Sequence, residues 1–152
     1  MSNRSEICEL MNMCMLTDEN GNVLAEYKVC PDIEGYIFPG GHVEKGESVT
    51  DSVIREMYEE TGLTVDNPTL CGVKQWFNSD GSRGIVFLYK ADKYHGDLKS
   101  SREGVVSWIP LEEFKNKESL WYMHETLEVF LNDNLSELFQ SDLGENTVIK
   151  LI

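Results

Sequence analysis

Between residues 41 and 63 the chain reads Gly41-His-Val-Glu-Lys-Gly-Glu47-Ser-Val-Thr-Asp-Ser-Val-Ile-Arg55-Glu56-Met-Tyr-Glu59-Glu60-Thr-Gly62-Leu63. Three of its carboxylates, Glu56, Glu59 and Glu60, follow each other at helical spacings i, i+3 and i+4. Like charges at these spacings repel, so a helix that gathers them on one face loses stability. Hard divalent cations such as Mg²⁺ and Mn²⁺ prefer oxygen ligands and would neutralise them. The stretch therefore predicts a metal site on a helix that follows a glycine-rich loop.

The same stretch resembles the Nudix box, G-x5-E-x7-R-E-U-x-E-E-x-G-U, where U is a bulky aliphatic residue. The seven fixed positions are all met, by Gly41, Glu47, Arg55, Glu56, Glu59, Glu60 and Gly62. Met57 stands where Ile, Leu or Val is usual, a mild departure because Met fills a similar volume. The resemblance implies the Nudix fold, an α/β/α sandwich with a mixed β-sheet in which the box forms a loop–helix–loop.

The resemblance also implies roles for the box residues. Glu59 and Glu60 are expected to bind the metal directly, and Glu56 to be a ligand or the base that activates water. Arg55 precedes Glu56 and lies at i, i+4 from Glu59, where a guanidinium can orient a carboxylate and keep it ionised. Glu47 is expected to pair with Arg55 and to brace the loop. We therefore predict catalytic roles for Glu56, Arg55 and Glu47.

Two further groups of metal ligands are candidates. The loop carbonyls of Gly40 and Gly41 are oxygen donors that could complete a coordination sphere, although the same glycines also suit an ordinary tight turn. Outside the box, Glu103 precedes Trp108 in a segment similar to one in MutT-like Nudix enzymes, where a loop glutamate approaches the metals. Glu112 and Glu113 are close alternatives, and a lone loop glutamate is commonly solvated.

The resemblance implies that a metal-activated water attacks a phosphorus of a diphosphate linked to a second group X, with Mg²⁺ as cofactor and Mn²⁺ as a possible substitute. Segments 70–76, 108–110 and 127–134 resemble bacterial 8-oxo-dGTP diphosphatases more weakly. We therefore expect an oxidised nucleoside triphosphate to be cut to monophosphate and pyrophosphate. The alternatives are a nucleotide sugar, ADP-ribose or a dinucleotide as substrate, a non-catalytic nucleotide-binding regulator, and an acidic interaction protein.

Residues outside the carboxylate set could bind the substrate. A purine site needs an aromatic platform and amide groups that read the base edge, and phosphate attracts cationic side chains. The candidates are Lys45 and His42 for phosphate, Trp76, Phe77 and Trp121 for stacking, and Asn132 and Asn134 for the base edge. Each also has an ordinary interpretation, as a solvated loop residue, a core aromatic or a capping asparagine.

Composition and charge narrow the classes of partner. A chain of 152 residues suits one domain, which we place at residues 1–152. The formal net charge of −14 argues against a nucleic-acid polymer, whose phosphates are held by basic surfaces. The N-terminal residues lack the apolar region of a signal peptide, and no apolar run approaches the ~20 residues of a membrane span. We expect a cytoplasmic protein with a small nucleotide partner and no membrane partner; a homodimer is left open.

The apolar periodicity predicts the elements around the box. Strands are expected at 7–16, 23–29, 36–38, 69–77, 85–91 and 105–109, and residues 146–152 form a strand or a tail. The first two strands are expected to pair as a hairpin through the turn at 18–22, with Cys8 and Cys14 as buried free thiols. Helices are expected at 48–61, at 111–114 and at 118–132. In the first helix, the apolar arc that packs on a sheet comprises Val53, Ile54, Met57, Tyr58 and Thr61.

Overall fold

The computed structural model describes residues 4–141 and 146–152, so part of the predicted domain, residues 1–3 and 142–145, lies outside the described residues. The elements follow the order β1 (Cys8–Leu16), β2 (Asn22–Cys30), β3 (Ile33–Ile37), α1 (Val49–Thr61), β4 (Leu63–Val65), β5 (Thr69–Phe77), β6 (Arg83–Ala91), β7 (Tyr94–Gly96), β8 (Val105–Pro110), α2 (Leu111–Phe114), α3 (Met123–Leu131), β9 (Glu137–Gln140) and β10 (Ile149–Leu151). Within the described ranges, no helix is long and apolar enough to cross a membrane.

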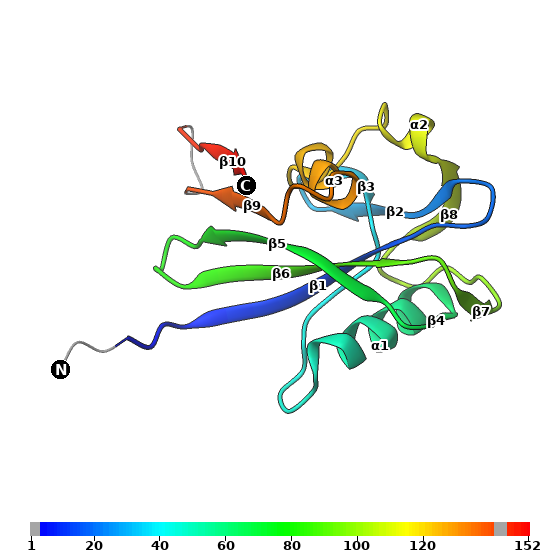
Figure 1. Ribbon diagram of the computed structural model, residues 1–152, viewed down its shortest axis with the longest axis horizontal. Coiled ribbons are helices and arrows are strands. Elements are labelled where there is room, and N and C mark those ends of the chain that lie inside the picture. The colour runs from blue at the N-terminus through cyan, green and yellow to red at the C-terminus, as the bar shows by residue number, and fades with distance from the viewer. Residues whose placement is uncertain (1–3, 142–145) are drawn as a thin grey trace.

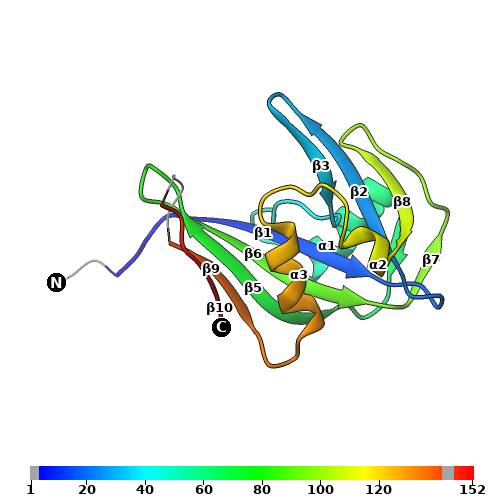
Figure 2. The same cartoon turned by 90° about the horizontal axis from the view of Figure 1, so that it is seen from above.

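The largest sheet is mixed, with strand order β1-β6-β5-β9-β10. Strand β6 pairs parallel with β1 and antiparallel with β5, and β5 pairs parallel with β9. Two smaller antiparallel sheets have the orders β3-β2-β8 and β4-β7. Helix α1 lies against one face of the mixed sheet and α3 against the other (Figure 1), while the β3-β2-β8 sheet lies beside it (Figure 2). The predicted α/β/α sandwich with a mixed sheet is confirmed.

Strand β1 is buried on both faces where the helices cover it. Met13 and Met15 belong to the core cluster that contains Phe130 of α3. Cys14 and Leu16 belong to the cluster that contains Val53 and Met57 of α1. Because side chains alternate between the faces of a strand, a continuous apolar run fits a strand that is covered on both sides. Cys14 is therefore buried as predicted, whereas Cys8, at the start of the strand, is exposed.

Both ends of α1 are capped by residues of the box. The Ser48 hydroxyl accepts a hydrogen bond from the backbone N–H of Asp51 at 3.0 Å. At the other end Gly62 has a φ of 75°, and its N–H donates to the Tyr58 carbonyl at 2.8 Å. A left-handed residue at this position favours glycine because it has no side chain to clash with the backbone. The box sequence thus fixes where this helix begins and ends.

The predicted hairpin between β1 and β2 is wrong. Asp18 does form the expected turn, since its carboxylate accepts from the backbone N–H groups of Asn20 and Asn22 at 2.9 and 2.8 Å. Beyond the isolated bridge between Thr17 and Val23, however, β1 pairs with β6 while β2 pairs with β3 and β8. Turn chemistry is local, whereas the partner of a strand depends on which sheet buries its two faces.

The third predicted helix is shorter than expected, and three short strands were missed. Helix α3 begins only at Met123 because Trp121 and Tyr122 have left-handed φ values of 47° and 57°. Strands β4 and β7 have three residues each and β9 has four, too few for a periodic pattern to stand out. The predicted C-terminal strand is confirmed as β10, within residues 146–152.

Candidate active site

Helix α1 places its three predicted ligands in different surroundings. The Glu59 side chain is 57% exposed, Glu56 is 13% exposed and Glu60 only 2%. The apolar arc was partly wrong, because Tyr58 is exposed and Glu60 is buried instead. The buried stripe follows Val53, Met57 and Glu60 at i, i+4 and i+7, which is one face of a helix. A carboxylate in that stripe needs polar partners, and they come from outside the helix.

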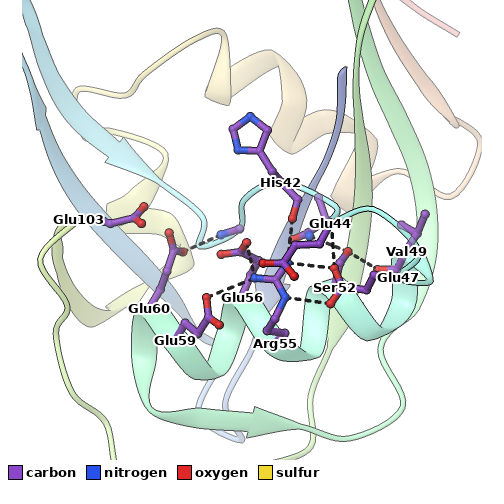
Figure 3. Close-up of polar contacts among 12 residues, drawn as sticks. His42, Glu44, Glu47, Val49, Ser52, Arg55, Glu56, Glu59, Glu60 and Glu103 are labelled. Atoms are coloured by element: carbon purple, nitrogen blue, oxygen red, sulfur yellow. Dashed lines mark hydrogen bonds and ion pairs between the residues drawn. The ribbon is translucent and has the colours of Figure 1, made fainter. Parts of the chain in front are cut away.

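Arg55 is the centre of a hydrogen-bond network that joins the loop to the helix (Figure 3). Its Nε and Nη2 donate to the two carboxylate oxygens of Glu47 at 2.8 and 3.0 Å. Its Nη1 donates to Glu56 Oε1 at 2.8 Å and to Glu59 Oε2 at 3.2 Å, and Nη2 also donates to the His42 carbonyl at 2.9 Å. The predicted Glu47–Arg55 pair is confirmed, and these hydrogen bonds from Arg55 hold the pKa of Glu47 below its usual range.

Glu60 is fixed by the loop on one side and by a lysine on the other. Its Oε2 accepts a hydrogen bond from the backbone N–H of Gly40 at 2.8 Å, and its Oε1 lies 3.3 Å from Lys28 Nζ. Burial, and after it the negative charge of Glu26, raises the pKa of Glu60 to about 8, against the lowering effects of Lys28 and Gly40. The raised pKa means that the surroundings of Glu60 do not fully offset the charge of its ionised form.

The ammonium group of Lys28 lies 3.3 Å from a carboxylate oxygen of each of Glu26, Glu60 and Glu103. Glu26 is fully buried, and among the described residues neither of its carboxylate oxygens has a hydrogen-bond partner of good geometry. Burial raises the pKa of Glu26 despite the nearby ammonium. Sequence analysis missed Glu26 and Lys28. The one signal in the sequence was Glu26 itself, an acidic residue directly after the apolar start of β2.

The donors around this cluster fit a hard divalent cation. They are carboxylate oxygens, which Mg²⁺ and Mn²⁺ prefer, and the two buried members have raised pKa values, so added positive charge would stabilise their ionised forms. In residues 4–141 and 146–152 no three acidic, histidine or cysteine side chains already form a metal cage. Arg55 and Lys28 form ion pairs with these carboxylates. Glu59, Glu60 and Glu103 stay the predicted ligands of such an ion, and Glu56 stays a predicted ligand or base.

Gly40 and Gly41 bring the backbone into contact with the carboxylates. The Gly41 carbonyl accepts a hydrogen bond from the Asn12 N–H at 2.8 Å, which ties the loop to β1. A Cβ on Gly41 would lie 2.5 Å from the Glu56 carboxylate, and one on Gly40 would lie 2.2 Å from the Asn12 carbonyl oxygen. At Gly40 the obstacle is backbone, so only glycine fits there, whereas at Gly41 it is the Glu56 side chain, which would have to move. Their carbonyls stay predicted metal ligands.

Substitution Gly41→Ala is expected to lower turnover far more than stability. The added methyl group must displace the Glu56 carboxylate from its contact with Arg55, and misplacing a catalytic group by ~1 Å costs on the order of 100-fold in rate. Gly46→Ala in the same loop is the matched control. Its φ of +85° makes alanine strained, but nothing lies within 4 Å of the new Cβ. We expect Gly46→Ala to lower the free energy of unfolding by ~1–2 kcal/mol and to leave kcat near wild type. Equal rate losses in the two variants would contradict this interpretation.

A cavity of about 520 Å³ extends from this cluster across β1 and β5. At one end it is lined by Lys28, Gly40, Gly41, His42 and Glu103. The rest is lined by apolar and aromatic side chains with three polar residues, namely Met11, Met13, Ile37, Phe38, Val86, Trp76, Trp121 and Tyr122 with Asn12, Lys74 and Gln140. The volume lies in the range of small-molecule sites. Glu103 is the one carboxylate in this lining. The box glutamates lie next to the cavity, since Glu60 contacts both Gly40 and Lys28 of its lining.

Two predicted substrate-binding residues, Trp76 and His42, line this cavity, as does Trp121. The indole N–H of Trp76 donates to Asn78 Oδ1 at 2.9 Å. The His42 ring points away from the box carboxylates (Figure 3), and its Nε2 lies 2.7 Å from Glu9 Oε1. These residues lie where a nucleotide could reach them.

Three other predicted substrate-binding residues lie outside the cavity lining. Lys45 is exposed in the turn before α1. Phe77 packs edge-to-face on Phe139, with ring centroids 6.2 Å apart. Asn132 ends α3, and its side-chain oxygen accepts from the Asn134 N–H at 3.0 Å, which is the ordinary turn role that the sequence left open.

Of the three glutamates proposed as a fourth carboxylate, only Glu103 lines the cavity. Glu112 and Glu113 lie on α2, where they form ion pairs with Lys115 and Lys117 at 2.6 and 2.8 Å. Glu103 is itself well exposed, and Lys28 is its link to the buried carboxylates. The structure therefore brings Glu103 to the cluster and leaves the alternatives outside.

Comparison with known proteins agrees with this geometry. The model of the NUDIX domain matches residues 12–130. The uncharacterised Nudix hydrolase YvcI of Bacillus subtilis is 42% identical over 86 residues, which are 53% of this chain and 54% of that protein. The oxidised purine nucleoside triphosphate hydrolase of Danio rerio is 33% identical over 89 residues, 55% of this chain and 57% of that protein. The chain thus spans about half the length of the curated relatives it matches.

A solved structure extends the similarity over nearly the whole chain. The MutT protein of Bacillus halodurans superposes with a TM-score of 0.76 and 26% identity, covering 94% of this chain and 97% of that one. The family model covers most of the chain and includes the complete box, the loop before it and every residue that lines the cavity except Met11 and Gln140. The chain therefore belongs to the NUDIX domain family and is MutT-like in sequence and fold.

Proposed function

We propose that this protein hydrolyses nucleoside triphosphates to monophosphate and pyrophosphate with Mg²⁺ as cofactor, and that Mn²⁺ can replace it. The observation that carries the proposal is a cavity in which Lys28 and Glu103, beside the box carboxylates, share the lining with aromatic side chains. The phosphates would bind beside the cation that the carboxylates hold, and the base would stack on the aromatic side chains. An oxidised purine nucleotide such as 8-oxo-dGTP is the preferred substrate, and the name of the Danio rerio relative supports this choice.

The chain's own residues divide the work. Arg55 donates to Glu56 Oε1 and so orients Glu56 to take the proton of the attacking water at its other oxygen. Glu59 and Glu60 would hold the cation, and Gly40 fixes Glu60 through its backbone N–H. Lys28 lines the cavity beside this cluster and offers positive charge to the phosphates. The divalent cation, when bound, lowers the pKa of water and offsets charge on the phosphate oxygens.

The deciding experiment is a substrate panel with product analysis. Purified protein is incubated with Mg²⁺ or Mn²⁺ and with oxidised and normal dGTP, ADP-ribose, a nucleotide sugar and a dinucleotide. We expect 8-oxo-dGTP to give the highest kcat/KM and to release monophosphate and pyrophosphate in equal amounts, with no turnover in EDTA. Preferential cleavage of ADP-ribose or a dinucleotide would replace the triphosphate assignment. Nucleotide binding without any turnover would indicate a regulator.

The location and the oligomeric state belong to the same proposal. We place the protein in the cytoplasm, where nucleotide substrates are found, and the free thiols of the described cysteines suit a reducing compartment. A small nucleotide is the proposed partner, with no role for a nucleic-acid polymer or a membrane. The homodimer stays a prediction that light scattering can check.

A further inference from the structure

Lys74 lies buried in the aromatic end of the cavity. It is only 5% exposed and lines the cavity from the middle of β5. Trp76 follows it by two residues, so both side chains are on the same face of the strand. Gln140, on the neighbouring strand β9, lines the same part of the cavity. A cationic side chain here is unexpected, because lysine is almost never fully buried without a purpose or a partner.

The surroundings of the Lys74 ammonium are poor in negative charge. It donates a hydrogen bond to the backbone carbonyl of Trp121. In the part of the chain that the structure describes, this carbonyl is its only recorded acceptor. Burial lowers the pKa of Lys74 to about 8, and the charge of Glu125 offsets this only in part. At neutral pH the group is therefore mostly protonated and has N–H groups left for a ligand.

The two residues next to this ammonium form an aromatic turn with a strained backbone. Trp121 and Tyr122 are consecutive non-glycine residues with left-handed φ values of 47° and 57°. Both line the cavity and both are about half exposed. Strained backbone of this kind occurs preferentially at ligand sites. A planar base that stacks on these rings or on Trp76 would present its edge to Lys74.

We propose that Lys74 determines base specificity by donating a hydrogen bond to the carbonyl oxygen at position 6 of a purine. Guanine offers only acceptors, O6 and N7, on this edge, and lysine commonly binds them, whereas adenine presents an amino group at position 6. Hypoxanthine and 8-oxoguanine also carry O6. The site therefore selects 6-oxopurines over adenine. The inference rests on the proposed nucleotide hydrolysis and names the substrate class of that site.

The hydrogen bond to Trp121 also gives Lys74 a structural role, and the test must separate the two roles. Loss of the Trp121 contact alone would reduce kcat/KM for all purines alike. Loss of base recognition would reduce kcat/KM for 6-oxopurines and change the ratio between substrates. The pair dITP and dATP is suitable because these nucleotides differ only at positions 6 and 1 of the base.

The experiment measures kcat/KM for dITP and dATP in wild type, Lys74→Met and Lys74→Arg. A charge-assisted hydrogen bond corresponds to ~10–100-fold, so wild type should prefer dITP by at least ~10-fold. In Lys74→Met we expect the two values to come within ~3-fold, mainly through loss on dITP. Lys74→Arg keeps the donors and should retain a preference for dITP. The matched control is Lys90→Met, which removes a half-buried lysine of β6 that pairs with Asp133 and should keep the wild-type ratio.

Several outcomes would overturn the inference. One is an unchanged ratio in folded Lys74→Met, and another is an equal loss on both substrates. If Lys74→Met does not fold, purine riboside triphosphate, which has no substituent at position 6, tests the wild type directly. Hydrolysis of this compound as efficiently as ITP would overturn the role of O6. If the wild type hydrolyses no triphosphate, the proposed function fails. Binding of IMP and AMP, measured by tryptophan fluorescence, then tests Lys74 alone. Equal affinities for the two nucleotides would refute its role in base specificity.

Discussion

With Mg²⁺ saturating, Glu56→Gln lowers kcat by at least ~100-fold, the usual contribution of a general base. Glutamine keeps the size of the side chain and can still accept a hydrogen bond from Arg55, which in the wild type donates to Glu56 Oε1 at 2.8 Å. It cannot accept the proton of the attacking water. Thermal stability should change little, because Glu56 is only partly buried and Arg55 keeps its two hydrogen bonds to Glu47.

Steady-state kinetics over a range of Mg²⁺ concentrations check this result. Glu44→Gln is the matched control, since Glu44 is an exposed glutamate of the loop before α1 and should leave kcat near the wild-type value. Turnover close to wild type in Glu56→Gln would remove Glu56 from the proton transfer. Recovery of the lost turnover by higher Mg²⁺ would make Glu56 a metal ligand instead of a base.

Glu60→Gln should have opposite effects on the stability of the protein and on its activity. Without metal, Glu60 is a buried carboxylate that shares one ammonium, Lys28, with Glu26 and Glu103. Neutralising it removes excess negative charge and leaves Lys28 two partners. We expect the free energy of unfolding in EDTA at pH 8 to rise by on the order of 1–3 kcal/mol. Activity should be lost, because a direct metal ligand is missing.

The pH dependence of stability provides the sharper measurement. The pKa of Glu60 is raised from 4.5 to about 8 in the folded protein. Between these values the folded state retains a proton that the unfolded state has released, so the free energy of unfolding falls as pH rises. Below pH 4.5 this difference is absent, and above pH 8 the loss is complete. Urea unfolding in EDTA at pH 5, 6.5 and 8 should show this slope in wild type and a weaker one in Glu60→Gln.

Mg²⁺ should reverse the order of stability of the two proteins. A cation that binds only the folded state stabilises it according to its concentration and affinity, so wild type should gain stability and Glu60→Gln should gain little. Glu59→Gln is the control, because Glu59 is mostly exposed and its replacement should leave stability in EDTA nearly unchanged. Lower stability of Glu60→Gln in EDTA at pH 8 would contradict the predicted effect of burial.

Local features of the fold were readable from the sequence because local chemistry produces them. Ser48 and Gly62 mark the two ends of α1. The Ser48 hydroxyl caps the first turn, and Gly62 adopts the left-handed φ that glycine favours. Glu47 and Arg55 are eight residues apart, across the start of α1, and their pairing followed from the box resemblance. The prediction of β5 was correct at both ends. Features of this kind depend on a few neighbouring residues.

Features that join distant segments were not readable in this way. The turn at Asp18 formed as predicted, yet β1 and β2 entered different sheets. Tyr58 was expected inside because it falls on the apolar arc of the helical wheel, but partners from β2 and from the loop at Gly40 allow Glu60 to be buried instead. Likewise, the left-handed turn at Trp121 shortened a helix that periodicity alone extended.

The sequence by itself determined the family, the box helix with its caps, and the carboxylates that would hold a cation, since fixed spacing along one helix specifies all of them. Only the tertiary structure decided which partners those carboxylates have. It set Lys28 among Glu26, Glu60 and Glu103, and it placed Lys74 at the aromatic end of the cavity. The physical reason is that burial and strand pairing depend on contacts between segments far apart in the chain, which no local pattern records.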